Sequence, residues 1–309
     1  MNPPPSNVTA EECLAATGLD SMLILNNNGI PLVVRHYRED SLLSNDEVLV
    51  SSFFSAMSTF ANQLLLSYIS DIGLVNQRLF FKYQGDVIYV LVFDEGKLVG
   101  RDYQSIRQFV EQIMWHLVGN FYPFYDQARR TLRPMELSRA IHEFHPTIDA
   151  LMVSGTQEYL RTSVVEGEPL LLTDLTFEQY GLEHLYILRG EEVLCEFELE
   201  GATPNVFTGD ILNSFFAAIT AFASNAFMTS LSDVGLFSNR LYVHTEAGFT
   251  FMLVVNELVY IGLSITDERA LVEKILRRIT RKFLDLPHHD QELITKEMLL
   301  FLRQWLIIP

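Results

Sequence analysis

The chain has 309 residues, of which 49% are hydrophobic and 20% are charged, and this composition excludes disorder over most of its length. The formal net charge of −17 repels phosphate backbones and so argues against nucleic acid as a partner. Two cysteines are too few for a disulfide framework, and the longest apolar stretch, 249–265, is interrupted by Asn256 and Glu257 and is too short for a membrane span.

In chain order, the first predicted elements are a short capped helix at 9–16, two strands and a longer helix. An apolar run at 22–25 ends in Asn-Asn-Asn-Gly, which favours a hairpin turn into a second strand at 31–37. Asp46 can then cap a helix that continues to about Leu66, because apolar residues recur there with a period near 3.6. Ser-Asp-Ile-Gly at 70–73 is predicted to turn the chain.

Three strands and two helices follow. The strands are predicted near 73–77, 79–83 and 87–93, with a turn at Gly-Asp between the last two. A helix with a regular apolar stripe is expected at 103–121. Another is expected at 135–144, begun by Pro134 and ended by Pro146. This order indicates an antiparallel sheet packed with helices.

The same order is predicted again in the second half, because the chain contains an internal repeat. The segment 52–81, SFFSAMSTFANQLLLSYISDIGLVNQRLFF, aligns without a gap with 214–243, SFFAAITAFASNAFMTSLSDVGLFSNRLYV. Of the 30 aligned positions 12 are identical, which indicates duplication of one ancestral segment.

The repeat extends in both directions. GLDSMLIL at 18–25 matches GLEHLYIL at 181–188, and VIYVLVFDE at 87–95 matches FTFMLVVNE at 249–257. Helices of the second copy are expected near 209–229, 267–284 and 292–306.

Together these patterns predict an α+β fold of the α/β two-layer kind, built from two tandem units. Each unit is expected to hold an antiparallel five-stranded sheet packed with two to three helices. The predicted division is a tail and short helix at 1–18, a first unit at 19–145, a connector at 146–181 and a second unit at 182–309. We call 19–145 the first repeat and 182–309 the second repeat.

On these residues, each repeat resembles a longin or roadblock-type domain. The resemblance rests on the element order, on FFSAM…F…SDIGL…RLFF and FFAAI…F…SDVGL…RLYV, and on the following strands VIYVLVF and FTFMLVV. Domains of this type are non-catalytic platforms that pair with each other across sheets and helices and bind small GTPases in trafficking and motility regulators. Tandem longin units recur in endosomal nucleotide-exchange complexes, and similar proteins occur in archaea that carry many small GTPases.

The resemblance implies a GTPase-regulating or trafficking-type scaffold whose partner is a small GTPase or another longin or roadblock protein. The resemblance carries over no catalytic residue. The low cysteine count favours a reducing cytoplasm, and the missing span is compatible with peripheral membrane contact. The resemblance and the missing apolar span together predict no transmembrane segment.

Patterns that could support catalysis or bind a cofactor are sparse, and each has a structural interpretation. His142 and His145 lie one helical turn apart, as metal ligands can, but histidine is also favoured near the end of a helix. His-His-Asp at 288–290 fits a helix entry with Asp290 as its N-cap. Gly-Lys at 96–97 lacks the rest of a phosphate-binding loop. We therefore expect no metal, no cofactor and no catalytic residue, and hence no enzyme.

Residues that recur in both repeats are predicted to be structural; they are Asp71, Gly73, Arg78, Asp233, Gly235 and Arg240. The Ser-Asp pairs and their glycines fit turns in which side chains bond backbone amides. No histidine recurs with the serines as a base. For the two arginines, two interpretations stay open: each faces a partner's carboxylate, or each ties the sheet to its own acidic turn.

One helix is basic in this acidic chain. The helix predicted at 267–284 carries five cations opposite Leu271, Ile275 and Ile279; they are Lys274, Arg277, Arg278, Arg281 and Lys282. They could meet an anionic membrane or an acidic partner. A solvated face whose cations suit the helix dipole is the favoured interpretation.

The leading hypothesis is thus a scaffold, and a small-molecule-binding sensory module is the alternative. A sheet backed by helices can hold a ligand between the two layers. An enzyme would need titratable groups that converge, and the repeated segments lack them.

Overall fold

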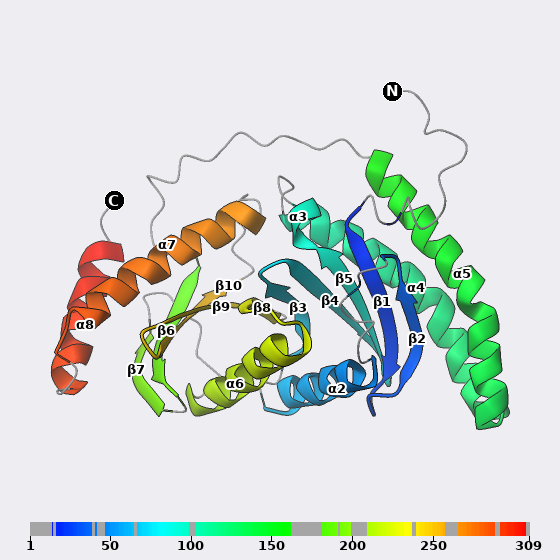
Figure 1. Ribbon diagram of the computed structural model, residues 1–309, viewed down its shortest axis with the longest axis horizontal. Helices are drawn as coiled ribbons and strands as arrows, with labels where there is room; N and C mark the ends of the chain where they lie inside the picture. Colours follow the sequence, from blue (N-terminus) through cyan, green and yellow to red (C-terminus); the bar gives the residue numbers. More distant parts are fainter. Residues whose placement is uncertain are drawn as a thin grey trace. The chain divides into compact units, whose positions relative to one another are not determined.

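The computed structural model describes residues 14, 17–38, 41, 47–64, 67–98, 103–161, 181–190, 192–198, 209–236, 239–256, 265–287 and 291–306. These residues form a mixed α+β fold with ten strands in antiparallel pairing, and the chain divides into two compact units (Figure 1). Unit 1 comprises 1–59 and 75–166, and unit 2 comprises 60–74 and 167–309. No helix within the described ranges is long and apolar enough to cross a membrane.

Unit 1 contains four strands in the order β2-β1-β5-β4: β1 Leu19–Asn26, β2 Pro31–His36, β4 Gln77–Gln84 and β5 Val87–Asp94. Its helices are α3 Glu95–Leu98, α4 Tyr103–Thr131, α5 Pro134–Arg161 and most of α2 Glu47–Leu64, whose residues from Phe60 onward belong to unit 2.

Two glycine turns join these strands as predicted. Gly29 has φ +77° between β1 and β2, and Gly85 has φ +59° between β4 and β5. Only glycine adopts such angles without steric cost from a Cβ atom. The side chain of Asn26 closes the first turn, because its Oδ1 accepts the amides of Asn28 and Ile30 at 3.0 Å each.

Helices cover both faces of the strands in unit 1. Neighbouring residues of a strand point to opposite faces, so the adjacent residues Phe80 and Phe81 of β4 pack on different faces of the sheet. The ring of Phe81 packs edge-on against Phe54 of α2 at 5.3 Å between centroids. Phe80 packs against Phe93 of β5, which in turn contacts Phe109 of α4. Helices α2 and α4 therefore lie on opposite faces, whereas the sequence predicts two layers.

Helices α4 and α5 are longer than predicted and run through a proline. The prediction that α5 ends before Pro146 is wrong, because the helix continues to Arg161. A proline inside a helix loses one backbone hydrogen bond and crowds the preceding turn. The apolar stripe compensates for this loss, since Ile141, Ile148 and Met152 are all buried on either side of the proline.

Unit 2 contains six strands in the order β3-β8-β9-β10-β6-β7: β3 Ile69–Leu74, β6 Leu182–Arg189, β7 Glu192–Glu198, β8 Leu231–Leu236, β9 Asn239–Glu246 and β10 Phe249–Asn256. Its helices are α6 Gly209–Ala226, α7 Ile265–Leu284 and α8 Gln291–Leu306. Helices α7 and α8 cover one face, where Phe283 of α7 packs on Phe251 of β10 and Met298 of α8 is fully buried. Helix α6 lies on the other face (Figure 1).

The segment predicted to turn the chain at 70–73 is a strand instead. It lies within β3, which pairs with β8, the strand at the corresponding position of the second repeat. The register is symmetric about Ile72 and Val234, which lie opposite each other and also correspond in the alignment of the repeats. Asp71 consequently lies opposite Gly235, and Asp233 lies opposite Gly73.

The predicted element order is confirmed in both repeats, with the four-residue α3 as an addition. The proposed cap Asp46, residues 162–180 of the connector and most of the helix expected at 9–16 lie outside the described residues.

Candidate functional site

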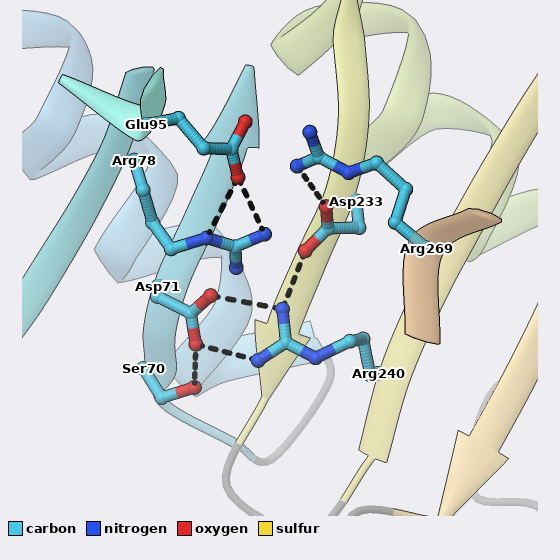
Figure 2. A network of polar contacts seen from close by, with 7 residues as sticks. All are labelled: Ser70, Asp71, Arg78, Glu95, Asp233, Arg240 and Arg269. Atoms are coloured by element: carbon cyan, nitrogen blue, oxygen red, sulfur yellow. Dashed lines mark hydrogen bonds and ion pairs between the residues drawn. The ribbon is translucent and has the colours of Figure 1, made fainter. Parts of the chain in front are cut away.

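Four charged residues of unit 2 form a buried group that we call the Asp–Arg cluster: Asp71 of β3, Asp233 of β8, Arg240 of β9 and Arg269 of α7 (Figure 2). The first three are at most 3% exposed, and the side chain of Arg269 is 22% exposed. Charged side chains are rarely buried to this extent unless they are paired.

Arg240 is the centre of the cluster. Its two terminal nitrogens donate to the two carboxylate oxygens of Asp71, each at 2.9 Å, and Nη1 also donates to Oδ1 of Asp233. This two-pronged geometry matches the planar guanidinium to the carboxylate and gives strong hydrogen bonds.

The remaining carboxylate oxygen, Oδ2 of Asp233, is also bonded, and Oδ2 of Asp71 accepts a second bond. Arg269 Nη2 donates to Oδ2 of Asp233 at 2.9 Å. The hydroxyl of Ser70 donates to Oδ2 of Asp71 at 3.0 Å. Two guanidinium groups therefore face two carboxylates inside unit 2.

The recurrent glycines make room for these carboxylates. A Cβ atom on Gly73 would lie 2.7 Å from Cγ of Asp233, and a Cβ atom on Gly235 would lie 2.5 Å from Oγ of Ser70. Neither glycine has a positive φ, so the prediction that they serve a turn is wrong. Close approach across the β3–β8 pair, rather than backbone freedom, requires glycine at both positions.

Arg78, the counterpart of Arg240 in the first repeat, is also buried, in unit 1. Its Nε and Nη2 each donate to Oε1 of Glu95 at 3.3 Å (Figure 2). Each recurrent arginine thus bonds carboxylates of this chain, as one of the two open interpretations held. Glu95, which accepts these hydrogen bonds, is a residue of α3.

The Asp–Arg cluster is a buried ion-pair network, and its chemistry fits a structural role. A buried ion pair adds little net stability relative to an apolar core, but losing one partner is costly and leaves a buried charge. Such a cluster therefore selects one arrangement of its strands. Here a slip of β3 against β8 would move Asp71 away from Arg240 and would move both aspartates away from the glycines that accommodate them.

A second polar network lies in unit 1, and no sequence pattern predicted it. The hydroxyl of Ser41 donates to Oδ2 of Asp20 at 2.8 Å and lies 3.2 Å from Nδ1 of His36. His36 Nε2 lies 3.0 Å from Oε1 of Glu47, the first residue of α2. These four residues follow no known motif spacing, and the histidine does not recur, so neither spacing nor repetition reveals them.

This polar network has the residue types of a serine–histidine–acid triad but not its geometry. A nucleophilic serine must be accessible and must give its proton to the histidine. Ser41 is 2% exposed, and its hydroxyl is directed at Asp20. The arrangement therefore ties β2 to the start of α2.

The histidine pair of α5 is brought together as predicted, with 4.9 Å between the ring centroids of His142 and His145. Burial and the nearby Arg35 lower the pKa of His145 below its ordinary value. Across the described ranges, no group of three or more His, Cys, Asp or Glu side chains is placed to hold a metal ion. The motif at 288–290 lies outside those ranges.

The five cations of α7 lie on its outer face. Lys274, Arg277, Arg278 and Arg281 are exposed and Lys282 is half-buried. The opposite face is buried at Ile275 and Ile279, as the periodicity predicts.

No model of a known protein family matches the chain, and no curated protein sequence matches it.

Proposed function

We propose that this chain is a non-catalytic protein-interaction scaffold of two tandem longin/roadblock-like units, and that it binds or regulates a small GTPase or a trafficking-type complex. The observation that carries the proposal is the symmetric pairing of β3 with β8 inside unit 2. These strands occupy corresponding positions in the two repeats, and domains of the type that the sequence resembles pair with each other across sheets and helices.

A helix contact in unit 2 supports the same mode of pairing. Phe60, near the end of α2, stacks on Phe215 of α6 with 5.4 Å between ring centroids and 13° between ring planes. The two helices correspond in the repeat, so equivalent strands and equivalent helices both meet within this unit. Stacked aromatic rings add about 0.5–1.5 kcal/mol beyond the apolar area that they bury.

The use of the recurrent charged residues also favours a scaffold over an enzyme. Arg240 donates to both Asp71 and Asp233, and Arg78 donates to Glu95. Groups held in this way position strands, whereas a catalytic acid or base must reach a substrate.

A scaffold also needs a surface for its partner, and unit 1 offers an exposed apolar patch. Val48 and Leu49 of α2 are 63% and 56% exposed, and Ile30 in the β1–β2 turn is 56% exposed. The turn packs on α2, since a Cβ on Gly29 would lie 2.7 Å from Cα of Ser52, one helical turn beyond Val48. Exposed apolar side chains gathered in this way mark protein interaction sites.

The test is a pull-down with the full-length chain immobilised and small GTPases of the same organism in solution. Each GTPase is offered with GDP and with a non-hydrolysable GTP analogue. We expect at least one GTPase to be retained in one nucleotide state and not in the other. Retention of none in either state contradicts a GTPase partner.

A variant tests the patch separately. Val48→Ser with Leu49→Ser should weaken retention, whereas Met135→Ser on α5, which is 86% exposed, should leave it unchanged. Equal loss in both variants contradicts a role for the patch. A thermal-shift screen with metabolites addresses the sensory alternative, which a reproducible shift would favour.

A further inference from the structure

Four exposed cations form a straight stripe along α7. Lys274, Arg277, Arg278 and Arg281 follow the spacing i, i+3, i+4 and i+7, which places them on one face of the helix. The stripe is roughly 10 Å long at 1.5 Å per residue. We call these four residues the basic stripe.

The core of unit 2 fixes the direction of this stripe. Val272, Leu276 and Phe283 on the inner face of α7 are at most 4% exposed. With that face packed on the sheet, α7 cannot roll to bury its cations. The basic stripe therefore faces solvent whenever unit 2 is folded.

Cations outnumber carboxylates along the stripe. Between 273 and 282 the chain has five cations and one acidic residue, Glu273, which accepts a hydrogen bond from Arg277. Glu246, at the end of β9, also acts on Arg277 electrostatically. The whole chain has 39 acidic and 22 basic residues, so this local excess of positive charge runs against the composition.

We propose that the basic stripe docks the protein on an anionic membrane surface, such as a bilayer that contains phosphatidylserine. Protein interfaces have an apolar, desolvated centre, and none of the large exposed apolar side chains in the described part of the chain belongs to α7. A plane of anionic headgroups needs no such centre, because cations near its surface each contribute about 1 kcal/mol without insertion. The docking does not depend on a GTPase partner.

The remaining charge of the protein determines how this docking behaves. The net charge of −17 repels an anionic bilayer, so only an orientation with α7 facing the lipid is favourable. Attraction over a stripe of four cations decays within a Debye length of about 8 Å at physiological salt. The binding is therefore weak, oriented and sensitive to salt.

The experiment is co-sedimentation of the full-length chain with vesicles. Vesicles of phosphatidylcholine with about 30% phosphatidylserine are compared with phosphatidylcholine alone, at about 50 mM and about 500 mM salt. We expect binding to the anionic vesicles at low salt and its loss at high salt. No binding to anionic vesicles at low salt overturns the proposal.

A pair of variants with equal net charge tests the site. Lys274→Gln with Arg281→Gln removes two cations of the stripe and should lower the partition coefficient by about 25-fold, at about fivefold for each cation. Arg130→Gln with Arg139→Gln removes two exposed cations of α4 and α5 and should leave the partition coefficient within about twofold. Equal losses in both pairs would mean that net charge alone drives binding, which overturns docking through α7.

The same proteins are tested against soluble polyglutamate. Capture by polyglutamate that the first pair abolishes, without vesicle binding, would assign the stripe to an acidic protein and overturn the membrane proposal.

Discussion

Replacing Arg240 with methionine should destabilise unit 2 strongly. The substitution removes two hydrogen bonds to Asp71 and one to Asp233, and both carboxylates are at most 1% exposed. Breaking a buried ion pair by removing one partner costs about 3–5 kcal/mol. Asp233 keeps its bond from Arg269 and Asp71 keeps its bond from Ser70, but Asp71 loses both of its bonds from the Arg240 guanidinium. The expected change is a large part of the roughly 5–15 kcal/mol that stabilises a typical domain.

Urea denaturation followed by far-UV circular dichroism measures this change. Arg277→Met is the matched control, since Arg277 pairs with Glu273 at an exposed position. Exposed pairs of this spacing contribute only about 0.3–0.5 kcal/mol.

A double variant separates the ion pair from packing. Asp71→Asn together with Arg240→Met should lose less stability than the two single losses added, with a coupling of about 0.5–3 kcal/mol. The reasoning is refuted if Arg240→Met is as stable as the Arg277→Met control, or if the double variant shows no coupling.

Three further outcomes are expected. Gly73→Ala should destabilise unit 2 because its Cβ would meet Asp233, whereas Gly119→Ala, on an exposed helix position with open space around it, should stabilise by about 0.5–1 kcal/mol; equal effects in thermal melts would contradict the close-approach account. The pKa of His145 is lowered in the folded state, so its contribution to stability is complete above about pH 6.5 and declines as the pH falls through the folded pKa. Urea titrations from pH 7.5 to 5 should show that the free energy of unfolding declines in the parent chain and declines less in His145→Gln. Identical pH profiles for the two proteins would contradict a contribution from His145. Burial raises the pKa of the Cys195 thiol, so in a Cys13→Ser background Ellman's reagent at pH 8 should modify it only after unfolding, and rapid modification of that native variant would contradict its burial.

The parts of the fold that follow from local physics could be predicted from the sequence. Asn-Gly at 28–29 and Gly-Asp at 85–86 mark hairpin turns because their backbone angles favour glycine. The helix α7 follows from the period of its apolar residues, and its cations lie opposite them. These features depend on residues that are neighbours in sequence.

The parts that depend on distant residues could not be predicted. Nothing near Gly73 shows that Asp233 lies opposite it, so a glycine needed for close approach looks like a turn glycine. Pro146 gives a strong local stop signal, and the buried Ile148 and Met152 override it through tertiary packing. Repetition revealed three members of the Asp–Arg cluster, but Arg269 comes from α7 outside the aligned segments, and only the structure shows its bond to Asp233.

The most direct test of the scaffold proposal is a calorimetric titration of the full-length chain with purified small GTPases of the same organism, each in its GDP form and its GTP-analogue form. We predict saturable binding of at least one GTPase, with affinities for its two nucleotide forms that differ by about tenfold or more, which corresponds to about 1.4 kcal/mol. Equal affinities for both forms, or no heat of binding with any GTPase, would contradict the claim that the protein recognises a small GTPase as a regulator does.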